Sequence, residues 1–471
     1  MKSLCKILLS LLLYISAQGQ TYFNKTYDFE GIQNYGGRHL ILRDSTIFLP
    51  TTYYTFSDSG VIRYMFLNST GDTLFTKKTS SALTYFGLTS ASPIEDETDS
   101  SIIFTCGTSD TTNNLNAFLT KLNSTGDTLW TKIIGGTGYD CFHTILSDTS
   151  GYYFIGLTNS FGAGSYDVWF LKTARNGTIL QNIAIGNTAS NQAISACWSN
   201  DGNILISGAE SSDDLLMKVD RSGNLIWRQV YPLGMGQCFV TTDSNSAIYL
   251  ASSTIGPAGF DNLVLRKTDS TGAMIWERTY INTTSYVYSI NPVYVALNGH
   301  LYLSSSTTSF SVTRGFLWCF SPTGDSLWSA QYTSTPGLDA YFTHLSPFPG
   351  GGFLMSGFAD TPNQYNNAWL VRVDSNGCLI PGCPNSVEEL GLDEDMRIMI
   401  SPNPASDLIH LAFTDQPAQG SILIYNAAGA VIMQEEYSST KNISALSEGI
   451  YFIRYQMAHG GDACGKFIIS R

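Results

Sequence analysis

The chain has 471 residues, of which 13% are charged and 13% are aromatic, and its formal net charge at pH 7 is -13. This acidity disfavours nucleic acid and anionic membranes as partners, because both require clustered Lys and Arg side chains. The 43 glycines against 15 prolines favour short strands joined by tight turns and argue against a disordered chain. At this length we expect two folded units.

Residues 1–20 have the pattern of a secretory signal peptide. Two lysines precede the apolar run 7–15, and residues 17–19 (AQG) suit a cleavage site. Cys5 lies before the apolar run, whereas the cysteine of a lipoprotein follows it, so we expect no lipid anchor at this end. No other stretch approaches the roughly 20 apolar residues of a membrane helix. The sequence therefore predicts export and no transmembrane segment in the mature chain.

A glycine turn recurs seven times after the signal peptide, and the first and last of these glycines are 306 positions apart, a mean of 51 residues per repeat. This period is the size of one four-stranded propeller blade. We therefore predict an all-β fold with a seven-bladed β-propeller over residues 21–384. The turn glycines are Gly71, Gly126, Gly177, Gly223, Gly272, Gly324 and Gly377.

Each repeat carries the same series of strands. A short mixed segment such as 141–146 is expected to line the axis, and an apolar triplet such as 153–155 suits a strand covered on both faces. A third strand leads into the glycine turn. In five repeats an outer strand with an aromatic residue follows the glycine, at Phe75, Trp130, Trp227, Trp276 and Trp328. Residues 22–29 have outer-strand character, so we predict that they complete the last blade.

The Thr-Gly turn followed by Trp resembles the propellers of quinoprotein-type and related bacterial repeats, over residues 23 to about 380. This resemblance implies a fold and no particular function. The chain has no residue set that could be carried over as a cofactor site, so we expect no cofactor.

The cysteines indicate one disulfide and no metal site. Cys378 and Cys383 flank four residues and are predicted to pair in a small loop, since export places them where disulfides persist. No cysteine or histidine pair has the spacing of a zinc site. The other six cysteines of the mature chain stand singly in apolar strands and suit buried thiols, namely Cys106, Cys141, Cys197, Cys238, Cys319 and Cys464.

A second domain is predicted after a linker. Residues 385–397 are acidic and lack periodicity, as in a linker. Six short alternating segments follow in residues 398–471, which indicates a compact β-sandwich.

The motifs of this last domain resemble the type A C-terminal sorting domain of type IX secretion cargo. They are residues 401–407 (SPNPASD), 424–429 (IYNAAG), 446–454 (LSEGIYFIR) and 466–469 (KFII). The prolines are expected to start an edge strand, the glycines to serve turns and the tyrosine to point inward. The resemblance implies export through the periplasm, an interaction with the secretion machinery, and release or attachment at the cell surface. The matching motif residues are Pro402, Asn403, Pro404, Gly429, Gly449, Tyr451 and Lys466.

No local motif predicts a catalytic residue. The glycine-containing segments 135–138 and 162–165 lack the spacing of a phosphate loop and of a nucleophile elbow. His143 and His344 occupy similar places in two inner strands, which would bring both near the axis. Hydrogen-bonded core histidines are the other interpretation of this pair.

Ligand binding is expected on the face that holds the loops between second and third strands, because these loops vary on a rigid scaffold. The candidate ligand-binding residues are Phe161, Tyr166, Phe260, Phe310, Arg314 and Tyr365. A polar residue also recurs ten positions before the turn glycine, where it either starts a strand by bonding local backbone or contacts a ligand. These residues are Asn116, Asp167, Asp213, Asn262 and Asn367.

The sequence thus indicates an exported, surface-displayed or released binding or adhesion protein, monomeric, with a glycan or protein as its ligand. An alternative is an extracellular polysaccharide hydrolase or lyase whose acidic groups come from different blades. A third possibility is a structural component of a surface layer.

Overall fold

The computed structural model describes most of the chain, and within that part no residue lies in a helix. Among the described residues there is accordingly no helix long and apolar enough to cross a membrane. The chain divides into two compact units, residues 1–387 and 388–471. The predicted signal peptide and linker lie outside the described residues. Those residues are 22–28, 34–53, 61–79, 85–86, 91–109, 114–232, 234, 237–256, 261–280, 285–309, 312–362, 366–379, 398–403, 405–413, 420–426, 431–457 and 462–469.

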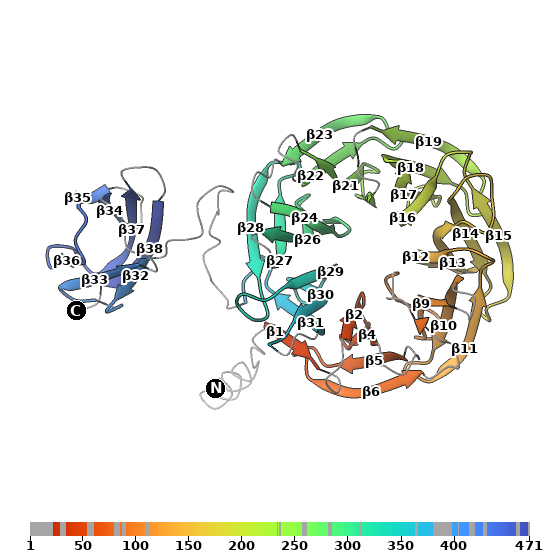
Figure 1. Ribbon diagram of the computed structural model, residues 1–471, viewed down its shortest axis with the longest axis horizontal. Helices are drawn as coiled ribbons and strands as arrows, with labels where there is room; N and C mark the ends of the chain where they lie inside the picture. Colours follow the sequence, from red (N-terminus) through yellow and green to blue (C-terminus); the bar gives the residue numbers. More distant parts are fainter. Residues whose placement is uncertain are drawn as a thin grey trace, which may run out of the picture. The chain divides into compact units, whose positions relative to one another are not determined.

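In its described part, the first unit consists of seven antiparallel sheets of four or five strands, arranged around a ring (Figure 1). Its strands are β1 (Phe23–Tyr27), β2 (Asn34–Gly36), β3 (Leu40–Ile41), β4 (Ile47–Tyr53), β5 (Val61–Leu67), β6 (Thr73–Thr79), β7 (Tyr85–Phe86), β8 (Ile94–Glu95), β9 (Ile102–Ser109), β10 (Leu115–Leu122), β11 (Thr128–Ile134), β12 (Asp140–Asp148), β13 (Gly151–Thr158), β14 (Asp167–Thr173), β15 (Ile179–Ile185), β16 (Asn191–Trp198), β17 (Ile204–Glu210), β18 (Asp213–Val219), β19 (Leu225–Tyr231), β20 (Phe239–Thr242), β21 (Ile248–Ile255), β22 (Asp261–Thr268), β23 (Met274–Tyr280), β24 (Ser285–Ile290), β25 (Tyr294–Val295), β26 (Leu301–Ser309), β27 (Val312–Phe320), β28 (Ser326–Tyr332), β29 (Ala340–Pro347), β30 (Phe353–Asp360) and β31 (Asn366–Val373).

Each sheet runs from an inner to an outer strand in chain order, as in β12-β13-β14-β15. One sheet is different, because the N-terminal strand β1 pairs with β31 and supplies its outer strand. The predicted all-β propeller class and its closure by the N-terminal segment are therefore confirmed. Closure joins the two ends of the first unit and leaves β31 without an open edge.

The apolar triplets form the second strands and lie in the core. All eight residues of β13 are buried, for example, because neighbouring sheets cover both of its faces. One cluster combines Phe48 and Phe66 of one sheet with Phe104 of the next, and the rings of Phe48 and Phe104 lie 5.9 Å apart. The sheets are therefore held together mainly by hydrophobic packing.

The recurring glycine and aromatic residues pack against each other across neighbouring sheets. Gly324 has φ +85°, and a Cβ on it would lie 2.9 Å from the ring of Trp276 in the preceding sheet. Gly377 and Trp328 are related in the same way. The turn thus needs glycine for its backbone conformation and for the room that the indole occupies.

A tyrosine in the outer strand adds a hydrogen bond to the same contact. The hydroxyl of Tyr231 donates to the carbonyl of Gly272 at 2.7 Å, and Tyr332 donates to Gly377 at 2.6 Å. Tyr27 of β1 donates to Gly71 at 2.7 Å, so the N-terminal strand makes the same contact as an ordinary outer strand.

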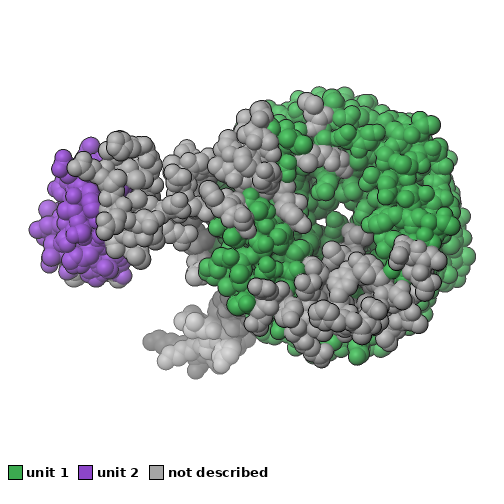
Figure 2. Space-filling view, viewed as in Figure 1, with its two compact units in different colours: residues 1–387 green, residues 388–471 purple. Residues whose placement is uncertain are grey.

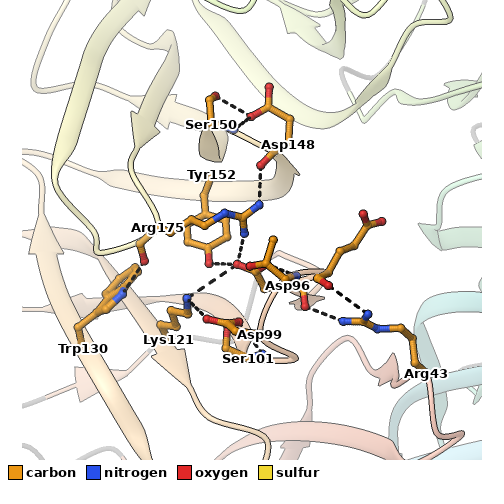
Figure 3. Close-up of polar contacts among 12 residues, drawn as sticks. Arg43, Asp96, Asp99, Ser101, Lys121, Trp130, Asp148, Ser150, Tyr152 and Arg175 are labelled. Atoms are coloured by element: carbon orange, nitrogen blue, oxygen red, sulfur yellow. Dashed lines mark hydrogen bonds and ion pairs between the residues drawn. The ribbon is translucent and has the colours of Figure 1, made fainter.

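A buried ionic network joins three neighbouring sheets (Figure 3). The fully buried Asp96 accepts hydrogen bonds from Tyr152 and Arg175, and Lys121 Nζ lies 3.8 Å from its carboxylate. Arg43 donates to the backbone carbonyl of Asp96 at 2.6 Å. Burial acts to raise the pKa of Asp96, but hydrogen bonds from Tyr152, its neighbouring threonine and Arg175 hold the pKa well below its ordinary value. Asp96 is therefore a buried carboxylate that stays ionised.

The second unit is a small β-sandwich of two antiparallel sheets, with orders β32-β33-β36 and β35-β34-β37-β38. The sequence predicted six of these strands and missed the short β36. The strands are β32 (Ile398–Ser401), β33 (Leu408–Phe413), β34 (Gly420–Asn426), β35 (Val431–Glu436), β36 (Thr440–Asn442), β37 (Gly449–Met457) and β38 (Asp462–Ile469).

The motif residues of this unit have structural contacts. Tyr451 is buried in the core, as predicted, and its hydroxyl donates to the carbonyl of Ser447 at 2.8 Å. Asn403 accepts a hydrogen bond from the backbone N–H of Ile468 at 2.9 Å. Gly449 begins β37. The expectation that Pro402 starts a strand is wrong: it follows the end of β32, where a residue without an N–H suits the end of a ladder.

Pro404 and Gly429 lie outside the described residues, and of Lys466 the structure describes only the backbone, in β38.

Candidate functional site

Two buried carboxylates fix the loops around β12, β13 and β14 on the predicted ligand face. Asp140 accepts hydrogen bonds from the N–H of Gly136 at 2.7 Å and the hydroxyl of Ser160 at 2.6 Å. Asp167 accepts from the N–H groups of Ala163 and Gly164 at 2.9 and 3.0 Å. Because each carboxylate holds backbone or side chains of a loop, the two loops have a defined shape.

These loops present three aromatic rings, Tyr139, Phe161 and Tyr166, which we call the aromatic loop surface. Tyr139 and Phe161 are 43% and 41% exposed. The rings of Tyr139 and Tyr166 meet edge to face at 6.4 Å, and Phe161 lies 6.2 Å from Trp169. Phe161 and Tyr166, which the sequence predicted, thus lie on one loop, and Tyr139, which the sequence reasoning missed, contacts Tyr166.

The other predicted ligand residues are separated from this surface or not described. Arg314 lies in β27 and is partly exposed. Phe260, Phe310 and Tyr365 lie outside the described residues, as does Cys383. Cys378 is buried and disulfide-bonded, and its pairing with Cys383 remains a prediction.

The recurring polar residues before the third strands are largely buried. Asp167, Asn262 and Asn367 have 1%, 3% and 6% of their surface exposed. Asp167 bonds the backbone of its own loop, as the structural interpretation predicts. We therefore assign Asp167 to loop support rather than to ligand contact.

A pair of acidic groups lies at the same end of the last sheet. Asp339 accepts a hydrogen bond from the N–H of Thr313 at 2.6 Å and one from the hydroxyl of Tyr341 at 3.2 Å. Burial, followed by the charge of Asp339, raises the pKa of Asp360. A carboxylic acid with a raised pKa beside a second carboxylate has the properties of a general acid.

A second cluster lies on the inner strands, around the axis. His39 and His344 come from neighbouring sheets, their ring centres are 4.7 Å apart, and Ser92 lies 3.2 Å from His344 Nε2. His143 contacts the carbonyl of Ala193 through Nδ1 at 2.7 Å. Arg38 lies 5.9 Å from the ring of Phe239 on another sheet. We call Arg38, His39, His143 and His344 the axial cluster.

The axial cluster contains one cation and three neutral imidazoles at pH 7. Burial lowers the pKa of His39 to about 3 and that of His143 to about 4. Burial also lowers the pKa of His344 well below its ordinary value, and the charges of His39 and Arg38 add to this. Burial lowers the pKa of Arg38 only to about 10, so its guanidinium remains charged.

A pocket of about 430 Å³ opens along the same inner strands. It is lined by Leu40, Ile94, Ile145 and Trp198, which come from four consecutive sheets, and by Arg43 with its partner Glu95. Leu40 lies two residues after Arg38, and Ile145 lies two residues after His143. Two residues span roughly 7 Å of extended chain. The pocket therefore lies on the hairpin side of the axial cluster, away from the predicted ligand loops.

The sequence placed His143 and His344 near the axis as one of two interpretations but missed Arg38 and His39. β-Bulges interrupt the inner strands at Phe142/Thr144 and at Phe342/His344. A bulge inserts an extra residue and redirects side chains, and it cannot be read from an apolar pattern.

The fold and these sites define a class: an all-β protein with a β-propeller followed by a β-sandwich. Residues 399–470 match the family of the secretion system C-terminal sorting domain. The second unit is therefore a type IX sorting domain, which confirms the resemblance seen in the sequence, and the chain is an exported protein that is secreted or displayed at the cell surface.

No curated protein matches this chain. Solved structures similar to it include a putative 6-phosphogluconolactonase from Bacteroides fragilis, with 12% identity, a TM-score of 0.44, and coverage of 74% of this chain and 98% of that one. A NanB sialidase from Streptococcus pneumoniae has 8% identity, a TM-score of 0.42, and coverage of 78% and 72%. A protein of unknown function from Dyadobacter fermentans has 9% identity, a TM-score of 0.42, and coverage of 75% and 99%. Similarities of this size say nothing about function.

Proposed function

We propose that this protein is a binding or adhesion protein that captures a glycan or a protein through the aromatic loop surface and does not convert it. It enters the periplasm with removal of residues 1–20 as its signal peptide, crosses the outer membrane by means of its C-terminal domain, and acts as a monomer. The observation that carries the proposal is the exposure of Tyr139 and Phe161 on loops that Asp140 and Asp167 hold in place.

Exposed aromatic rings on a fixed backbone suit ligand binding for two reasons. Each ring offers a large apolar face, and Tyr adds a hydroxyl that bonds a polar group. An aromatic side chain has only two rotatable bonds, so little conformational entropy is lost when it contacts a ligand. Sugar rings and protein surfaces both present apolar patches with polar edges, which this surface matches.

We expect Phe161→Ala and Tyr166→Ala each to weaken binding at least tenfold, because aromatic anchors carry most of the binding energy of such surfaces. The measurement is the dissociation constant for a ligand found by screening the full mature chain against extracellular polysaccharides and surface proteins. Phe75→Ala is the matched control, since Phe75 is 39% exposed on the outer strand β6. Equal loss in the control and in the two loop variants would contradict the proposal.

The second candidate function is a polysaccharide hydrolase or lyase, and the raised pKa of Asp360 beside Asp339 favours it. In this case the full chain would release product from a polysaccharide. Asp360→Asn would abolish turnover while leaving saturable binding in place.

We expect removal of residues 388–471 to prevent passage across the outer membrane, because the sorting domain lies in this unit. In a host with type IX secretion, the truncated protein should accumulate in the periplasmic fraction, whereas the full chain reaches the surface or the medium. A periplasmic marker enzyme controls for leakage. Truncated protein in the medium without that marker would contradict the assignment.

A further inference from the structure

Arg38 is a cation near the axis. None of the described residues shown to contact its guanidinium carries a negative charge. Its charge lowers the pKa values of His143 and His344, which belong to two other sheets, and it lies 5.9 Å from Phe239 on a third. Within the part of the chain that the structure describes, no carboxylate pairs with Arg38 and no hydrogen bond holds its guanidinium. Arg38 therefore lies near three other sheets, and among the described residues its charge has no carboxylate partner.

The groups around Arg38 are polar but uncharged. His39, His143 and His344 are neutral at pH 7, and Ser92, Ser346 and Ser356 contact two of these rings. The cluster as a whole thus carries a single positive charge. A partly exposed cation among neutral groups attracts an anion from solution.

Solvent reaches this region. Arg38 is partly exposed, whereas the neighbouring His39 is buried. The pocket of about 430 Å³ lies on the same inner strands, and Figure 2 shows the surface of the first unit hollowed at the centre of the ring. The pocket is not lined by the cluster itself, so the exposed part of Arg38 is where a small ligand would make contact.

We propose that the axial cluster is a second binding site, separate from the aromatic loop surface, and that it takes one carboxylate group through the guanidinium of Arg38. A guanidinium donates two parallel N–H bonds that match the two oxygens of a carboxylate. One cation balances a monoanion and leaves a phosphate dianion with an uncompensated charge. The carboxylate belongs either to a small acid or to an acidic sugar.

The test is thermal unfolding of the full mature chain at pH 7.5 and constant ionic strength, in sodium chloride, sodium acetate, sodium glucuronate or sodium phosphate. We expect acetate or glucuronate to raise the unfolding midpoint of the propeller in a saturable manner, because a ligand that binds only the folded state stabilises it. A response to acetate indicates recognition of the bare carboxylate, and a response to glucuronate alone indicates recognition of the sugar as well.

Two variants test the role of Arg38. We expect Arg38→Met to abolish the response to carboxylates and to change the midpoint in chloride little, since the partly exposed Arg38 makes no ion pair among the described residues. Arg38→Lys keeps the positive charge but cannot donate two parallel N–H bonds, so binding of the carboxylate should weaken at least about tenfold. Arg278→Met is the control, because Arg278 is exposed on the outer strand β23.

Three results would overturn the proposal: equal midpoints for the unaltered chain in carboxylate and chloride, a carboxylate response that survives in Arg38→Met, and a larger response to phosphate than to either carboxylate. Phe161→Ala should keep the full carboxylate response, so failure of this site and failure of the aromatic loop surface are distinguishable.

Discussion

Replacing Asp96 by asparagine is expected to lower the free energy of unfolding of the propeller by about 3–5 kcal/mol. This is the usual cost of removing one partner of a buried ion pair, because the other charge then stays buried without compensation. Asp96 is fully buried and faces Arg175, Lys121 and the hydroxyl of Tyr152. Without its negative charge, Lys121 would remain buried with only the partly exposed Asp99 as a carboxylate partner. The loss should appear in denaturant unfolding of the full chain, followed by the fluorescence of the propeller.

Asp72→Asn provides the matched control for this prediction. Asp72 pairs with Lys25 at 2.7 Å, but its side chain is 64% exposed. Solvent screens an exposed ion pair, which therefore contributes little to stability, so the control should unfold nearly like the unaltered chain. If Asp96→Asn is no more destabilising than Asp72→Asn, the network does not hold the three sheets together.

Acidification from pH 8 to 4.5 is expected to destabilise the propeller by about 2.7 kcal/mol through His39 alone. Burial lowers the pKa of His39 in the folded state to about 3, whereas an unfolded histidine titrates near 6.5. Well above pH 6.5 neither state binds a proton at this site, so stability does not depend on pH. Below it only the unfolded state takes up a proton, and the free energy of unfolding falls by about 1.4 kcal/mol per pH unit.

His143 and His344 contribute in the same direction, because their pKa values are also lowered in the folded state. Carboxylates such as Asp360, whose pKa is raised, also titrate toward the lower end of this window, so the slope is compared between variants. His39→Gln should therefore make the pH dependence shallower by about 1.4 kcal/mol per unit, whatever its effect at neutral pH. His410→Gln in the exposed part of β33 is the control. An unchanged slope in His39→Gln would show that the pKa of His39 is not lowered in the folded state.

The repeating parts of the fold could be predicted from the sequence because their signals are local and periodic. Each apolar triplet lies within one strand, and the turn glycine recurs at a spacing that matches one sheet. The structure adds the reason for the pairing of glycine with Trp276 or Trp328, which is contact between neighbouring sheets. The sequence also repeats a tyrosine in the outer strand. Tyr231 lies 41 residues before Gly272 and Tyr332 lies 45 residues before Gly377, and each tyrosine donates a hydrogen bond to that glycine.

The sites could be predicted only in part. Phe161 and Tyr166 could be predicted because aromatic residues in a polar loop between two strands are recognisable without an alignment. Arg38 and His39 were missed because ring closure brings them to residues far away in the sequence, as in the contact of His39 with Ser356 at a separation of 317. Asp96 and Arg175 are 79 residues apart and likewise belong to no motif. Such pairs depend on which sheets become neighbours.

The most direct test of the account is to incubate the full mature chain with each polysaccharide and surface protein of the screen and to measure equilibrium binding and released product in the same samples. The account predicts saturable binding to at least one ligand, weakened by Phe161→Ala, with no new product. Product that accumulates with time and disappears in Asp360→Asn would contradict the account and establish the propeller as an enzyme.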